Sequence, residues 1–125
     1  MKTPVIDKSV WEGLREFEKA EGSEGFFTEL LSTVLTASTT HMQGLLAASA
    51  AGDVAKTRHY SHSLKSTCAS LGAAGLSAQF AEIEAGCRAT PPVMDAGKVT
   101  AAQQVFQVFY KEVQEEYDRL TKSAA

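Results

Sequence analysis

Apolar side chains recur at helical spacing along almost the whole chain, and no long stretch alternates between apolar and polar as a strand does. Long amphipathic helices joined by short connections favour antiparallel neighbours. The sequence therefore predicts an all-α fold, an antiparallel four-helix bundle with a short extra N-terminal helix, formed by residues 1–125 as a single domain. The predicted helices span about residues 8–19, 24–50, 53–71, 74–88 and 94–120.

Residues that commonly begin or end helices mark these boundaries. Asp7 and Ser23 can cap the first two helices with their side-chain oxygens. Gly52 ends the second helix, and Asp53 begins the next helix at once. Thr90-Pro91-Pro92 is the strongest loop signal inside the chain.

Length, charge and cysteine content narrow the classes of function. The 125 residues carry 12 Lys and Arg against 15 Asp and Glu, and this net charge of −3 gives no support to nucleic-acid binding. The apolar runs are shorter than the roughly 18 residues that cross a membrane, and the N-terminus does not resemble a signal peptide. Cys68 and Cys87 are far apart, which favours buried free thiols in a reducing compartment. We expect a cytoplasmic protein without membrane insertion.

One histidine lies on the side of its predicted helix that faces away from the core. On a helical wheel, Leu64 and Cys68 share the core side, whereas His62 lies opposite them. Ser66 and Ala69, which lie beside His62, are small, so a second protein can approach the ring closely.

The residues around His62 suit nucleophilic chemistry. A neutral imidazole is a nucleophile near neutral pH, and Lys65, on the adjacent turn, can offset negative charge that arrives on the ring. Arg58 adds a second cation nearby. An exposed histidine beside an exposed lysine is also common on helices, so these residues alone leave a functional and a bland interpretation open.

The wider pattern resembles a known family. His62, Leu64 and Lys65 are followed at fixed spacing by Leu71-Gly72-Ala73 and then by Leu76, Phe80, Ile83 and Glu84. This pattern resembles the histidine-containing phosphotransfer (HPt) domain of bacterial phosphorelays, and the order of the helices extends the resemblance to nearly the whole chain.

The resemblance implies roles for individual residues. His62 is expected to carry the phosphoryl group and Lys65 to help hold it, with Gly72 supporting the motif. Ser66 stands where the family usually has glycine, which adds bulk beside the imidazole and a hydroxyl that can donate to phosphoryl oxygens. Glu84 stands where members often have Gln or Glu. It is either a solvated carboxylate or an acceptor for the Nδ1–H of the ring, which leaves Nε2 as the nucleophile.

The resemblance also implies partners. We expect a phosphoryl carrier without kinase activity of its own, which exchanges phosphoryl groups with response-regulator receiver domains and a hybrid sensor histidine kinase. The Mg²⁺ belongs to the receiver, and the chain itself needs no cofactor. We expect a monomer, or the C-terminal domain of a membrane-bound hybrid kinase. The expected docking surface consists of Arg58, His59, Ala69, Trp11 and Phe26. For Trp11 and Phe26, a place in the core is the open alternative.

Three other interpretations stay open. A bundle of this fold can instead sequester a receiver or another regulatory partner without being phosphorylated. The dimerisation bundle of a sensor kinase also carries a helical histidine, but an acidic residue usually follows that histidine, and here Ser63 does. A small metal- or cofactor-binding bundle is the third interpretation, because His59 and His62 have the spacing of a metal pair. No third ligand of suitable type lies at helical spacing, so we expect phosphotransfer and no metal site.

Overall fold

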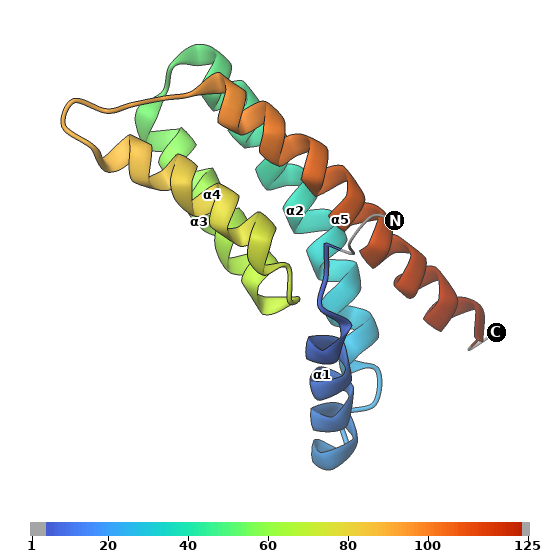
Figure 1. Cartoon of the computed structure of the whole chain (residues 1–125). Helices are drawn as coiled ribbons and strands as arrows, with labels where there is room; N and C mark the ends of the chain where they lie inside the picture. Colours follow the sequence, from blue (N-terminus) through green and yellow to red (C-terminus); the bar gives the residue numbers. More distant parts are fainter. Residues whose placement is uncertain (1–4, 124–125) are drawn as a thin grey trace.

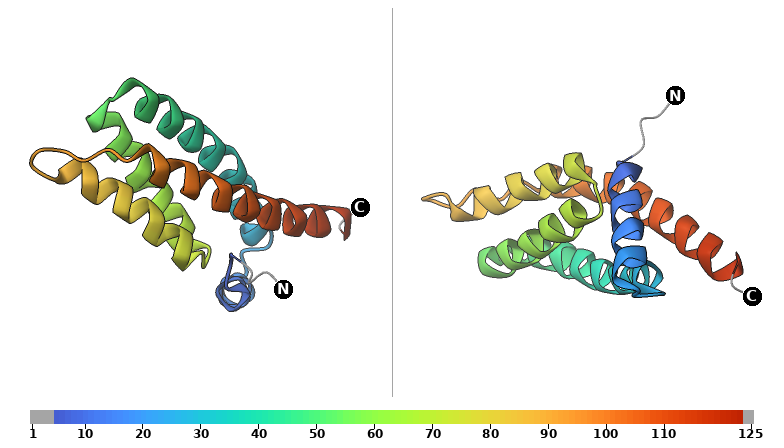
Figure 2. Two further views of the ribbon diagram at one scale, coloured as in Figure 1. Left: turned by 45° about the horizontal axis from the view of Figure 1, so that its top comes forward. Right: turned by 90° about the horizontal axis from the view of Figure 1, so that it is seen from below.

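Five helices make up the computed structural model, which describes residues 5–123 (Figure 1). Among these residues there is no strand, and the four longer helices form an antiparallel bundle with the first helix at one end (Figures 1 and 2). This confirms the predicted fold class. The helices are α1 (Lys8–Glu21), α2 (Phe26–Ala51), α3 (Val54–Ser70), α4 (Ala74–Arg88) and α5 (Ala96–Ser123).

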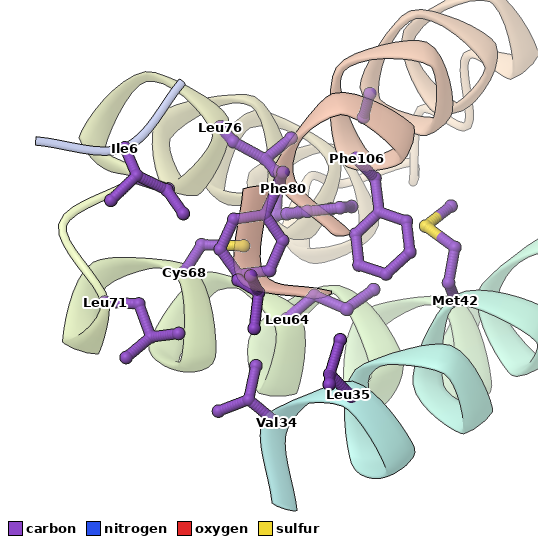
Figure 3. Packing of buried hydrophobic residues seen from close by; sticks show 14 of the residues in the cluster. Ile6, Val34, Leu35, Met42, Leu64, Cys68, Leu71, Leu76, Phe80 and Phe106 are labelled. Carbon is purple, nitrogen blue, oxygen red and sulfur yellow. The ribbon is translucent and has the colours of Figure 1, made fainter. Parts of the chain in front are cut away.

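The core lies between α2, α3, α4 and α5. Each of these helices packs against two neighbours in the order α2, α3, α4, α5, and α5 closes the ring against α2. Phe80 of α4 and Leu64 of α3 are fully buried and meet near the centre of the packed cluster (Figure 3). Burying each large apolar side chain contributes about 1.5–3 kcal/mol, so α3 and α4 are held firmly side by side.

Two of the predicted helix starts are confirmed by their capping bonds. The carboxylate of Asp7 accepts from the backbone N–H of Ser9 at 3.0 Å. The carboxylate of Asp53 accepts from the backbone N–H of Lys56 at 3.0 Å. Both bonds satisfy backbone donors that the first turn of a helix leaves unpaired.

The predicted start of α2 is wrong by two residues. Ser23 does not cap this helix, because Gly25, at φ +86°, precedes its first residue and makes no side-chain capping bond. Instead, the Glu18 carboxylate of α1 accepts from the backbone N–H of Phe27 at 2.9 Å. A side chain from the preceding helix thus serves the first turn of α2, and the local sequence around Ser23 does not reveal this.

The turn between α3 and α4 contacts the residue before α1 and α1 itself. Gly72 has φ +85°, and its carbonyl accepts from the backbone N–H of Asp7 at 2.9 Å. A Cβ at this position would lie 2.7 Å from the Asp7 carbonyl oxygen, so only glycine fits without a shift. The indole N–H of Trp11 donates to the Leu71 carbonyl at 3.0 Å. These contacts fix α1 to the end of the α3–α4 pair.

No helix within residues 5–123 has the length and apolar character needed to cross a membrane.

Candidate functional site

The exposed side of α3 presents His62 toward α4. The His62 side chain is 56% exposed, whereas Leu64 and Cys68 on the other side of the same helix are fully buried. The helical wheel predicts this division, because the apolar side of α3 must face the core. The imidazole is therefore accessible to a second protein.

Glu84 of α4 orients the imidazole. Its side chain is only 3% exposed, and its Oε2 lies 2.9 Å from Nδ1 of His62. Of the two alternatives that the sequence leaves open for Glu84, the structure therefore shows the acceptor and not the solvated carboxylate. Because α3 and α4 pack along their lengths (Figure 1), residues 22 positions apart in the sequence meet here.

Two cations share the same carboxylate. The Lys65 ammonium donates to Glu84 Oε1 at 2.7 Å, and the Arg88 guanidinium donates to Glu84 Oε2 at 2.7 Å. Lys65 is 31% exposed and Arg88 is 53% exposed, so both charges reach solvent while the carboxylate does not. Glu84 thus has a partner on each of its oxygens.

The balance of these contacts keeps Glu84 ionised. Burial alone would raise the pKa of the Glu84 carboxyl, but hydrogen bonds from Lys65 and His62 and the charges of Lys65 and Arg88 outweigh it and lower the pKa. An ionised carboxylate can only accept hydrogen bonds. When the His62 ring is neutral, its hydrogen therefore lies on Nδ1 and Nε2 keeps the lone pair.

A hydrogen bond between α4 and the backbone of α3 lies beside the site. The Ser77 hydroxyl of α4 donates to the backbone carbonyl of Lys65 at 2.9 Å. This bond joins the two helices beside the site and helps to hold Lys65 and His62 in register with Glu84.

A shallow depression lies beside His62. Its lining combines Arg58, His59 and Ala55 of α3 with Arg88 of α4, next to His62 and Glu84. The structure therefore places Arg58 and His59 next to the imidazole. Ser66 and Ala69 are exposed on the following turns of the same helix.

The expectation that Trp11 lies on the docking surface is wrong. Its side chain is only 4% exposed, its ring packs edge-on against Phe27 at 5.9 Å, and its N–H is used by Leu71. Phe26 is half-buried and contacts Phe17, with ring centroids 5.8 Å apart. Phe17 itself is 52% exposed, so Phe17 and not Trp11 is the exposed aromatic side chain of α1.

Gly72 does not lie at the imidazole. It lies in the turn between α3 and α4, where its carbonyl accepts from the backbone N–H of Asp7 and not from a residue of the site.

Sequence reasoning missed Arg88 and Ser77. Arg88 follows Glu84 by one helical turn, and this spacing is a usable signal for an ion pair once Glu84 is a candidate. Ser77 gives no such signal, because its bond to Lys65 depends on how α3 and α4 are aligned. Among residues 5–123, no three His, Cys, Asp or Glu side chains gather where they could hold a metal ion.

These features define a class of protein, the histidine phosphotransfer module: a helical bundle that presents one exposed imidazole, oriented by a buried acceptor and flanked by a lysine. Residues 29–123 match the family model of the Hpt domain, and the chain belongs to this family.

Comparison with solved structures agrees. The crystal structure of histidine-containing phosphotransfer protein B (HptB) from Pseudomonas aeruginosa PAO1 is similar, with a TM-score of 0.79 and 25% sequence identity. The match covers 94% of this chain and 98% of that chain. No curated protein matches the chain significantly.

Membership in the family establishes the general role. Hpt domains are phosphocarrier modules and not kinases, and their partners are response-regulator receiver domains. The chain thus has a histidine phosphotransfer role in a phosphorelay.

Proposed function

We propose that His62 accepts a phosphoryl group from the phospho-aspartate of a receiver domain, or of a hybrid sensor kinase, and passes it to the aspartate of another receiver. One observation carries this proposal: Nδ1 of an exposed His62 faces a buried carboxylate at 2.9 Å, which leaves Nε2 free toward solvent.

The transfer step follows from that geometry. The Nε2 lone pair forms an N–P bond while the P–O bond to the receiver's aspartate breaks, and the electron pair leaves with the aspartate oxygen. Nδ1 keeps its hydrogen, so the phosphorylated ring becomes cationic. The ionised Glu84 stabilises that cation. In the reverse direction, the ring leaves as neutral imidazole, which is a far better leaving group than its anion.

Lys65 provides the positive charge that the phosphoryl group needs on this chain. Its ammonium lies one helical turn from His62 and is partly exposed, so it can turn toward negative charge on Nε2. We propose that the receiver supplies Mg²⁺ and most of the catalytic groups, and that this chain contributes positioning and charge. It then acts as a cofactor-free carrier and not as an enzyme.

Two separate groups of residues support receiver docking, one around His62 and one at the α1–α2 end. Arg58 and His59 line the adjacent depression, Ala69 leaves the helix surface flat, and Phe26 with Phe17 offers apolar contact at the α1–α2 end. Ser66 adds a hydroxyl beside the approach path. We propose a monomer that acts in the cytoplasm, alone or as the C-terminal domain of a membrane-bound hybrid kinase.

Mixing the protein with a phosphorylated receiver tests the proposal. The protein should acquire a label that is stable in base and lost in acid, as expected for phosphohistidine, and His62→Gln should acquire none. His41→Gln is the control, because its ring lies on α2, where it packs against Tyr60, and outside the proposed docking residues. If His62→Ala binds every partner and signals normally, the chain is instead a binding module that works without phosphorylation.

A further inference from the structure

Glu84 has two cationic partners, which belong to different helices. Lys65 belongs to α3 and donates to Oε1, whereas Arg88 belongs to α4 and donates to Oε2, the oxygen that also faces His62 Nδ1. Arg88 and Glu84 are one turn apart on the same helix, so their contact does not depend on the alignment of α3 and α4. Arg88 is also the last residue of α4, where a cation is favoured by the helix dipole.

Phosphorylation affects the ion pairs of Lys65 and Arg88 with Glu84 differently. A phosphoryl group on Nε2 attracts the Lys65 ammonium. When the ammonium turns toward this group, its contact with Glu84 Oε1 weakens. Glu84 is only 3% exposed, and a buried carboxylate that loses its counter-ion is strongly disfavoured. The phosphorylated ring brings one positive charge to Oε2. Among the residues that the structure describes, Arg88 is the other Lys or Arg side chain that forms an ion pair with Glu84.

We propose that Arg88 is a positioning residue: it keeps Glu84 ionised and directed at His62 Nδ1 while Lys65 turns to the phosphoryl group. This inference rests on the proposed phosphorylation of His62. Arg88 acts through Glu84 and has no need to touch the phosphoryl group. The guanidinium suits this task because it is always charged and its donors are held in a rigid plane.

The inference predicts a dependence between two residues. Arg88 matters only because the residue at 84 is a buried anion. A neutral amide at 84 still offers an oxygen to Nδ1–H but needs no counter-ion. Removing Arg88 should therefore be harmful in the native protein and nearly harmless once Glu84 is replaced by Gln.

Phosphoramidate, a small phosphoryl donor, tests this dependence without a protein partner. Nε2 forms the N–P bond while the donor's P–N bond breaks, and its electron pair leaves with ammonia. The rate of phosphohistidine formation, followed by ³¹P NMR, is compared among the full chain, Arg88→Met, Arg88→Lys, Glu84→Gln and the double variant Glu84→Gln/Arg88→Met. Arg119→Met is the control, because Arg119 forms a 2.7 Å ion pair with Glu116 on α5, away from the site.

We expect Arg88→Met to lower the rate about tenfold, the size of a charge-assisted contact that is partly exposed, and Arg88→Lys to restore most of it. The double variant should match Glu84→Gln within about twofold, and Arg119→Met should match the native chain. ¹⁵N NMR of His62 should show the hydrogen on Nδ1 becoming less localised in Arg88→Met, a change that a purely structural role would not produce.

The outcomes separate the two hypotheses. If the native chain gains no phosphohistidine that His62→Gln lacks, the proposed function fails and this inference fails with it. If the native chain is phosphorylated and Arg88→Met is equally fast, this inference alone is overturned. It is also overturned if Arg88→Met is equally harmful in the Glu84→Gln background, because Arg88 would then bind the phosphoryl group directly.

Discussion

Glu84 accepts from three side chains although almost none of its surface is exposed. This one carboxylate favours hydrogen on Nδ1 of His62, and it binds the side chains of Lys65 and Arg88. Desolvation works against its ionised form, but the three partners more than compensate. The chemistry of the exposed ring is therefore set by a residue that a partner protein does not reach.

The lowered pKa of Glu84 predicts a pH dependence of stability. A carboxyl whose pKa falls on folding stabilises the native state at any pH above the pKa of the unfolded chain, here the ordinary value of 4.5. That stability is lost as the pH falls from there through the lowered native pKa. The free energy of unfolding, measured in urea from pH 7 to pH 3, should fall less in Glu84→Gln than in the native chain. An identical pH profile for the two proteins would contradict this assignment.

The two cysteines are buried thiols, as the sequence predicts. Burial raises the pKa of Cys68 to about 12, and burial also raises the pKa of Cys87. Since the thiolate is the reactive form, we expect neither cysteine to react with iodoacetamide at pH 8 in the native state, and both to react after unfolding. Rapid native alkylation of Cys68, detected by mass spectrometry, would contradict the packing of α3 described above.

At the scale of elements, the pairing of α3 with α4 builds the site, and the turn between these helices positions α1. The segment before α1, α1 itself and this turn are joined by the backbone bond from Asp7 to Gly72 and by the bond from Trp11 to Leu71. The conformation of Gly72 thus matters to the assembly of elements far apart in the sequence.

Three glycine-to-alanine substitutions separate the cost of a positive φ at Gly72 from the cost of its clash with Asp7. Gly72→Ala should cost about 1–3 kcal/mol, because it combines a positive φ with a clash against Asp7. Gly52→Ala, with φ +70° and open space around it, should bear the conformational cost alone. Gly75→Ala, inside α4 with open space, should be neutral or stabilising. Urea unfolding gives the order, and an equal effect at Gly72 and Gly52 would contradict the clash.

The element boundaries show what the sequence could and could not predict. Capping by Asp7 and Asp53 is local, so residue preference alone finds it. Capping by Glu18 requires α1 and α2 to meet, and no local pattern encodes that meeting. The direction of His62 follows from helical periodicity. The Ser77 contact follows only from the alignment of packed helices, whereas the one-turn spacing of Glu84 and Arg88 can be read from the sequence. The burial of Trp11 depends on Leu71, which lies 60 residues away, so no local pattern reveals it.

For the whole molecule, the net charge of −3 conceals an uneven distribution. Arg58, Lys65 and Arg88 lie near His62, where a phosphoryl group and an acidic receiver site would approach. The apolar Phe17–Phe26 pair lies instead at the α1–α2 end. Among the described residues, the bundle thus carries a group of cations around His62 and a separate pair of apolar aromatic side chains at the α1–α2 end.

Two phenylalanines test the division between core and surface. Phe80→Ala empties a fully buried position and should destabilise the whole bundle by about 3–5 kcal/mol. Phe17→Ala, at a residue that is 52% exposed, should leave the urea midpoint nearly unchanged but weaken binding to a cognate receiver. A large loss of stability in Phe17→Ala, or unaltered receiver binding, would contradict its place in the docking surface.

We propose that Nε2 of His62 is the nucleophile because Glu84 holds the hydrogen on Nδ1. The most direct measurement is ¹⁵N and ³¹P NMR of the phosphorylated, ¹⁵N-histidine-labelled protein, which identifies the nitrogen bonded to phosphorus. We expect one phosphohistidine, at His62, with phosphorus on Nε2 and hydrogen on Nδ1. Phosphorus on Nδ1, or on a histidine other than His62, would contradict it.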